Sequence, residues 1–311
     1  MERPVYLPTW QLWRGLRHPP YNHPLFRHIR QQAAMDYFQL PFWLVAGAIA
    51  AVILLVLLSD ASLTIFAIML LTIAVPLVVL LANGTLFGIA FTIEVTQTLH
   101  RTALNFSEAL LKLTPMGGLG SAYLIAAACL HRKDRLNQLN RVVRLCVIGT
   151  IAGAIIAMLL VLLTLSPANA NGRVFDWRLI SGLLGLIAGA LLLYLDHIQS
   201  MVLATLIGML ATRLTLLDLG KGIAAGVLFA LAQAGSYAVV LLASLSLGVI
   251  LQHTAIDGGP AAHVGLTLTL YYLLREGLIT LLWHRLIQDH DATFTEACTM
   301  LYRTFDRSLA S

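Results

Sequence analysis

The order of apolar and polar positions divides the chain into long charge-free runs separated by short polar stretches. Residues 61–93, 145–172 and 222–256 contain no Asp, Glu, Lys or Arg. A helix needs about 20 apolar residues to cross about 30 Å of hydrocarbon, so each run is long enough to span a lipid bilayer. The pattern therefore predicts an all-α fold, that of a polytopic α-helical membrane protein.

The number of predicted spans depends on residues 198–217. The other predicted spans are 41–59, the run from 62 to about 95, 145–166, 178–195, 222–251 and 263–284. Pro76 and Asn83-Gly84 are expected to kink or interrupt the second span, and Asp196-His197 is expected to end the fourth. Residues 198–217 are apolar but only just long enough to cross. The chain thus has six transmembrane helices if this stretch is re-entrant or interfacial, and seven if it spans.

Residues 23–40 form the first of two amphipathic segments outside the spans. Six apolar residues share one broad face of a helix, whereas arginines and glutamines occupy much of the other. The apolar set is Leu25, Phe26, Ile29, Ala33, Tyr37 and Leu40. This pattern predicts a helix that lies in the membrane interface and turns into the first span.

A second polar segment separates the second and third spans, in a cytosolic insertion over residues 94–142. Its apolar residues Ala103, Phe106, Leu110 and Leu113 recur at spacings of three and four, which predicts a surface helix that Thr114-Pro115 ends. Met116-Gly117-Gly118 supplies a break. A second helix, 119–130, reaches only about 18 Å and is expected to be interfacial or buried. The insertion either fills space under the bundle or docks a cytoplasmic partner.

Lysine and arginine placement predicts the domain organisation and the orientation. Residues 1–40 and 101–144 hold twelve of the 20 Lys and Arg residues. Positive charge near span ends marks the cytoplasmic side, so the N-terminus is expected in the cytoplasm and the protein in the plasma (inner) membrane. We expect a cytosolic N-terminal segment with an interfacial elbow helix (1–40), a transmembrane domain (41–285) and a C-terminal interfacial or cytosolic helix (286–311). The side of the C-terminus stays open.

Composition agrees with this class and argues against several others. The chain is 59% hydrophobic and 11% charged, whereas a soluble domain carries about 25% charged residues. The net charge is +5, but the basic residues lie beside the predicted spans, so no nucleic-acid partner is expected. Cys129, Cys146 and Cys298 lack paired spacing, and we expect no metal site and no cofactor. Neither a P-loop nor another catalytic motif occurs, so the chain is not expected to be an enzyme.

Ionisable residues within the apolar runs are the candidates for a functional site, because a charge at bilayer depth is costly. They are Glu94, Asp196, Arg213, Arg275 and Glu276. Asp196, His197 and Arg213 are expected at span ends, where water reaches them. Arg275 and Glu276 lie inside a predicted span and point about 100° apart, so they are expected to pair with other helices, with Glu94 as one possible partner of Arg275. A structural ion pair and a substrate contact both remain open.

Two short motifs carry a family resemblance over roughly residues 23–135. His23-Pro24-Leu25-Phe26-Arg27 precedes the first span, and Leu110-Leu111-Lys112-Leu113-Thr114-Pro115 ends the cytosolic helix. This arrangement resembles permeases of the ABC-2 type. Where that family usually has an Arg- and Glu-rich run followed by Gly-Thr, this chain has Thr-Gln-Thr-Leu-His-Arg-Thr-Ala at 96–103.

The resemblance implies a coupling helix that meets a separate ABC ATPase subunit. The residues it assigns to that contact are Phe106, Leu110, Leu111, Lys112, Leu113, Thr114 and Pro115. The implied function is the membrane-spanning subunit of an ABC-2-type transporter, with a second permease subunit or a homodimer, and membrane lipid, as its other partners. The alternative function is a non-transporting accessory or scaffold subunit of a larger membrane complex.

Overall fold

A computed structural model describes residues 8–31, 84–104, 117–132, 177–212, 218–253 and 259–290, with isolated helical positions between 141 and 155. All regular structure in these residues is helical, which confirms the all-α prediction for them. The helices with defined bounds are α1 (Pro8–Arg17), α2 (Pro24–Gln31), α6 (Gly117–Leu130), α8 (Trp177–Ala211), α9 (Asp218–His253) and α10 (Gly259–Asp289). Residues 84–104 form a further helix.

Helix α8 is continuous through the position where a span was expected to end. It runs for 35 residues, and Asp196 and His197 lie near its middle. Residues 198–211 therefore belong to the same helix as residues 177–197, so the helix of the fourth predicted span does not end at Asp196-His197. A helix tolerates a polar pair in its interior when neighbouring helices supply partners, and both side chains are buried here.

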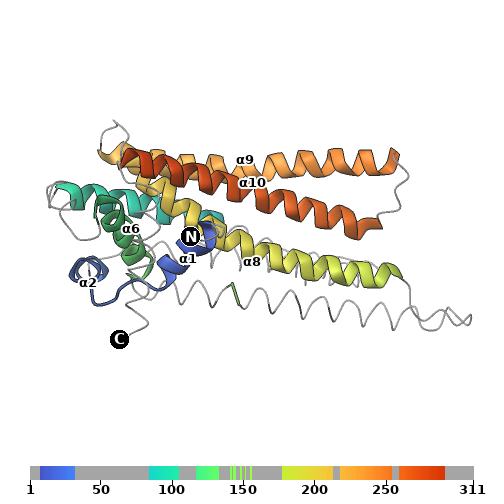
Figure 1. Ribbon diagram of the computed structural model, residues 1–311, viewed down its shortest axis with the longest axis horizontal. Coiled ribbons are helices and arrows are strands. Elements are labelled where there is room, and N and C mark those ends of the chain that lie inside the picture. Colours follow the sequence, from blue (N-terminus) through green and yellow to red (C-terminus); the bar gives the residue numbers. More distant parts are fainter. Residues whose placement is uncertain are drawn as a thin grey trace, which may run out of the picture.

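The three long helices lie alongside one another and the shorter ones gather at one end. In Figure 1, α9 and α10 run across the top with α8 below them, and α1, α2 and α6 lie at the left. Helix α8 packs against both α9 and α10, and α1 contacts α6, α8 and α10. The bounds of α9 and α10 confirm helices over the predicted ranges 222–251 and 263–284.

Small residues let helix 84–104 approach α8 and α9 closely. A Cβ placed on Gly88 would lie 2.3 Å from Phe229 of α9, and one on Gly208 would lie 3.0 Å from Val95. The hydroxyls of Thr92 and Thr96 donate to carbonyls of their own helix at 2.7 and 2.9 Å, and they also lie 3.3 and 3.1 Å from backbone oxygens of α8. Close backbone approach with hydroxyl donors is the usual means by which apolar helices associate in lipid.

Helix α2 confirms part of the predicted elbow helix but turns its apolar face toward protein. Phe26 and Ile29 are each 1% exposed and α2 packs on α6. The face expected to contact the membrane interface is therefore covered. Helix α6 is itself buried from Leu119 to Leu130, which agrees with the prediction that this helix is buried or interfacial. It begins at Gly117, whose φ of 69° suits glycine and matches the predicted break.

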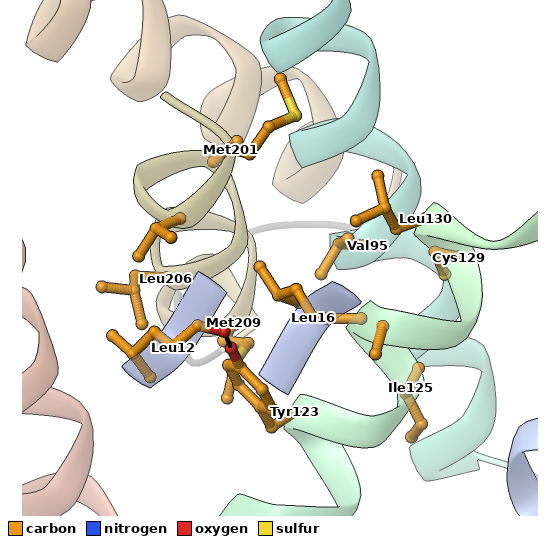
Figure 2. Packing of buried hydrophobic residues seen from close by; sticks show 14 of the residues in the cluster. Leu12, Leu16, Val95, Tyr123, Ile125, Cys129, Leu130, Met201, Leu206 and Met209 are labelled. Carbon is orange, nitrogen blue, oxygen red and sulfur yellow. Dashed lines mark hydrogen bonds between the residues drawn. The ribbon is translucent and has the colours of Figure 1, made fainter. Parts of the chain in front are cut away.

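Helix α1 was not predicted from the sequence. Leu12 and Leu16 belong to the main apolar cluster together with residues of α6, α8 and helix 84–104. Figure 2 shows Leu12 on the side of Leu206 and Met209, and Leu16 toward Val95 and Leu130. Leu12, Trp13 and Leu16 recur at helical spacing, so the sequence does carry an amphipathic signal here, but it extends over only ten residues.

Within the described residues, two stretches have the length and apolar composition needed to cross a bilayer. They are Tyr194–Ala211 in α8, of which 83% is buried inside the protein, and Gly220–Val249 in α9, of which only 28% is buried. The first is an interior helix and the second presents apolar side chains outward. The predicted span at 41–59, the part of the second predicted span at 62–83, most of 145–166, the coupling segment at 105–116 and residues 291–311 lie outside the described residues.

Candidate functional site

Among the described residues, the largest buried polar cluster lies where α8, α9 and α10 meet. Arg275 of α10 and Asp196 of α8 form an ion pair with Nη1 3.0 Å from Oδ1, and both side chains are almost completely inaccessible. Helical spacing explains how the cluster forms. Residues four apart share a face, and such pairs occur in each helix: Asp196 and Ser200, Gln233 and Tyr237, Tyr271 and Arg275.

The guanidinium of Arg275 is satisfied on each of its nitrogens. Nη1 donates to Ser200 Oγ at 2.9 Å and Nε to Ser236 Oγ at 3.4 Å, while Nη2 donates to Gln233 Oε1. A buried arginine is stable only when its charge is paired and its five N–H groups find acceptors. The acceptors come from α8 and α9, so Arg275 joins all three helices.

The carboxylate of Asp196 is held by hydroxyl donors in addition to the arginine. Tyr237 donates to Oδ2 at 3.1 Å and Tyr271 donates to Oδ1. The two phenol rings stack in parallel with centroids 6.1 Å apart, and Arg275 Cζ lies 5.5 and 5.4 Å from their centroids. The rings thus add cation–π attraction to the ion pair.

A second buried ion pair joins Glu94 to Arg132. Arg132 Nη1 lies 2.7 Å from Glu94 Oε1, and the side chains are 4% and 5% exposed. Arg132 Nε also donates to the backbone oxygen of Ile29 at 2.9 Å. One arginine just after α6 therefore connects α6, helix 84–104 and the elbow helix α2.

A further buried charge, that of Glu276, accepts hydrogen bonds from the N-terminus of α1. Its Oε1 accepts from the amide of Thr9 at 3.2 Å, and its Oε2 accepts from the Thr9 hydroxyl at 2.5 Å. The first amides of a helix have no partner within that helix and carry partial positive charge. Glu276 supplies both the acceptor and the opposite charge.

The charged and aromatic groups near α1 and α2 are more accessible. Burial, together with the nearby Arg17 and Arg14, lowers the pKa of His18. Burial alone lowers the pKa of His23, and burial raises the pKa of Tyr21 against the opposing effect of Arg30. The ring of Tyr21 lies edge-on to Phe26 and His131.

These contacts settle several sequence-based predictions. Arg275 and Glu276 do pair with other helices, as their positions indicated. The suggestion that Glu94 is the partner of Arg275 is wrong, because Glu94 pairs with Arg132 and Arg275 with Asp196. The expectation that water reaches Asp196 and His197 is also wrong, since they are 3% and 5% exposed.

Other predicted site residues lie outside the described part of the chain. These are Arg213 and the coupling residues Phe106, Leu110, Leu111, Lys112, Leu113, Thr114 and Pro115. Sequence analysis in turn missed several members of the clusters: Thr9, Arg132, Ser200, Gln233, Ser236, Tyr237 and Tyr271. A search for polar residues four positions apart within the apolar runs would have found Gln233 with Tyr237.

The clusters are chemically suited to holding helices together. Each charged group is compensated, and the acceptors and donors come from different helices. Among the described residues, no three His, Cys, Asp or Glu side chains gather so that they could hold a metal ion. Two buried atoms on α8, His197 Nε2 and Gln199 Oε1, have no hydrogen-bond partner.

The fold and the clusters place the described part of the protein in the class of helical bundles whose apolar helices are joined by buried ion pairs. Comparisons with known proteins do not narrow this class: no protein-family model, no curated protein and no solved structure matches the chain.

Proposed function

We propose that this chain is an integral membrane protein and serves as the membrane-spanning, permease-like subunit of an ABC-2-type transporter driven by a separate ATPase subunit. The membrane part of the proposal is supported by the outer surface of α9. Nine large apolar side chains on this helix are exposed: Ile223, Val227, Leu228, Leu231, Val239, Leu241, Leu242, Leu245 and Val249. Contiguous apolar surface on this scale is rare on soluble monomers and suits a lipid environment.

Helix α10 continues this apolar surface. Leu266, Leu270, Leu273 and Leu281 are exposed along it, while Arg275 and Glu276 point into the protein. Charges inside and leucines outside is the arrangement expected of a helix in hydrocarbon, where an unpaired charge is costly.

One observation carries the transport part of the proposal: Arg132 joins the elbow helix α2, helix 84–104 and α6. Residues 105–116, the proposed coupling segment, connect the end of helix 84–104 to the start of α6. Because Arg132 bonds both Glu94 and the Ile29 carbonyl, the two helices that flank this segment are fastened to each other and to α2. A force applied to the segment by an ATPase would therefore move these helices as one body, as coupling requires.

The alternative is a non-transporting scaffold or accessory subunit. The Asp196–Arg275 cluster favours it, since every charged group there is satisfied within the protein. A substrate that bound these groups would have to displace existing partners. Both proposals require membrane insertion, and they differ in whether an ATPase binds.

Co-purification from native membranes separates the two. The transporter proposal predicts that a P-loop ATPase co-purifies with the unaltered protein and is lost when Leu110 and Leu113 are both changed to Asp. The same substitution at Leu104, an exposed residue of helix 84–104, is the control. If no nucleotide-binding subunit co-purifies with the unaltered protein, the transporter proposal is wrong.

Partner number and orientation follow from the same proposal. A transporter of this type needs two membrane halves, so we expect a homodimer or a second permease subunit. The N-terminus, with Arg14, Arg17, Arg27 and Arg30 all exposed, is expected on the cytoplasmic side of the inner membrane.

A further inference from the structure

Helix α1 occupies a groove formed by α6, α8 and α10. Its apolar face is buried, with Leu12 at 1% and Leu16 at 0% exposure, and Trp13 lies edge-on to His197 of α8. Its other face is open, because Trp10 is 42% exposed and Arg14 and Arg17 are also exposed. The helix therefore lies on the bundle as a surface element with one buried face.

The N-terminal end of α1 is fastened to α10. Pro8, the first helical residue, lacks an amide hydrogen, so Thr9 presents the first free N–H of the helix. That amide and the Thr9 hydroxyl both donate to the Glu276 carboxylate. Among the described residues, these two hydrogen bonds are the ones that the carboxylate accepts. The Glu276 carboxylate therefore receives its hydrogen bonds from Thr9, and the N-terminus of α1 finds its acceptor and a compensating negative charge in Glu276.

The other half of α1 is fastened to α6. The hydroxyl of Tyr123 donates to the backbone oxygen of Leu12, a contact drawn as a dashed line in Figure 2. The ring nitrogen Nε2 of His131 lies 3.0 Å from the backbone oxygen of Leu16. Tyr123 adds a hydrogen bond to a carbonyl in the middle of α1, and His131 lies against a carbonyl in its last turn, so the helix joins α10 at its N-terminal end to α6 along its other half.

Helix α1 depends on these contacts for its own stability. It has ten residues, and isolated helices shorter than about 12–15 residues are marginal in water. It is joined to α2 by residues 18–23, which contain Pro19 and Pro20 and no helix. Loss of one set of contacts would therefore free the helix without breaking a covalent or helical connection within α8, α9 or α10.

We propose that α1 is a releasable strap: docked through Glu276, it fastens α10 to α6, and its release removes this link while Arg275 still holds α10 to α8 and α9. Arg275 and Glu276 are adjacent in α10 but contact different helices. Arg275 holds α10 to α8 and α9, whereas Glu276 holds it to α1. The docking of α1 is inferred from its contacts with α10 and α6 alone. Its regulatory consequence rests on the proposed transport function, because α6 directly follows the coupling segment and the strap connects α6 to the buried cluster.

Hydrogen–deuterium exchange of the full-length protein in lipid nanodiscs tests the docking. Thr9→Asp places a carboxylate opposite Glu276, and we expect the amides of residues 10–17 to exchange about tenfold faster or more, the loss expected when charged hydrogen bonds are broken. Thr9→Val keeps the amide bond and should have a smaller effect. Gln11→Asp adds the same charge in the first turn of α1 without removing a contact to Glu276, and serves as the control.

Two results of this experiment would overturn the proposal. Unchanged exchange over residues 10–17 in Thr9→Asp would show that Glu276 does not hold α1. Loss of protection around Asp196 and Arg275 at the same time as in α1 would show that α1 is an inseparable part of the core. Glu276→Leu removes both acceptors of the Thr9 hydrogen bonds from α10, and should release α1 while the Asp196–Arg275 cluster keeps its protection.

The regulatory role has a separate readout. In a complex that contains the ATPase subunit, Thr9→Asp should change the rate of ATP hydrolysis while Gln11→Asp leaves it unchanged. Equal rates in the two variants would overturn regulation by α1. Absence of any co-purifying ATPase would reject the transport function itself, and the exchange experiment would still decide the docking.

Discussion

Arg275 on α10 and Asp196 on α8 form a buried ion pair with Nη1 3.0 Å from Oδ1, enclosed by two stacked tyrosines. Neither charge could stand alone in this place, because an unpaired buried charge costs several kcal/mol. The pair is also the centre of a hydrogen-bonded group that reaches into α9 through Gln233 and Ser236. The guanidinium of Arg275 therefore links all three long helices.

Removing either charge of this pair should destabilise the protein strongly. Arg275→Met leaves Asp196 buried without its cation, and we expect a loss of about 3–5 kcal/mol in the free energy of unfolding. Asp196→Leu should cost a similar amount, and the double variant should cost clearly less than the sum. Unfolding in detergent by a chemical denaturant measures this cycle. Arg285→Met, at a 65% exposed position, is the control and should change stability little. Strictly additive losses would contradict the coupling.

Arg132 is expected to govern the attachment of α2. Arg132→Lys can keep the charge opposite Glu94 but cannot also reach the Ile29 carbonyl with a planar fork. We expect faster hydrogen exchange over residues 24–31 with little change in α9. Arg27→Lys alters an exposed arginine whose partner is Asn22, and provides the matched control. Equal exchange in the two variants would show that the bond to Ile29 contributes nothing.

Gly88 should not tolerate a methyl group. A Cβ at this position would lie 2.3 Å from the ring of Phe229, which is fully buried. Gly88→Ala is expected to cost about 1–3 kcal/mol of stability through overpacking. Phe229→Leu should restore part of that loss when combined with it.

Gly235 offers the control for this prediction. It is also helical, but a Cβ there would meet nothing within 4 Å. Gly235→Ala should be neutral or stabilise by about 0.5–1 kcal/mol, because alanine loses less conformational freedom in a helix. A destabilisation by Gly235→Ala equal to that of Gly88→Ala would contradict the packing described for helix 84–104 and α9.

Acidification should loosen α2 through His23. Burial lowers the pKa of this residue below 6.5, and its Nδ1 has no hydrogen-bond partner. The folded state therefore binds the proton more weakly than the unfolded state, so the stabilising contribution of neutral His23 is complete above about pH 6.5 and falls as the pH drops toward the folded-state pKa. Hydrogen exchange over residues 24–31 from pH 7.5 to 5 measures it. His23→Asn should remove this part of the pH dependence, and an unaltered profile in that variant would assign it to another group.

Helices with long apolar runs could be predicted from the sequence, and the pairing of their charges could not. The ranges of α9 and α10 follow from hydropathy alone, since local composition decides whether a segment is helical. Glu94 was proposed as a partner of Arg275 because both lie in apolar runs, and that reasoning carries no information on which helices are neighbours. Helix packing places Arg132 beside Glu94 and Asp196 beside Arg275, and these pairings could be known only from the tertiary structure.

The misplaced end of the fourth span has the same origin. A polar pair such as Asp196-His197 ends a span when water is the only available partner. A prediction from the local sequence has to assume this, because it contains no information on neighbouring helices. In the folded protein Arg275, Tyr237 and Tyr271 surround Asp196, so the helix continues.

By itself, the sequence determined the helical class, the approximate ranges of α9 and α10, the break at Gly117 and the inward direction of Arg275 and Glu276, because these follow from local composition and helical geometry. The tertiary structure alone decided which charges pair, that α2 turns its apolar face to α6, and that α1 caps its N-terminus with Glu276. These are contacts between residues far apart in the chain, and their energies depend on burial and neighbours that exist only after the helices have packed.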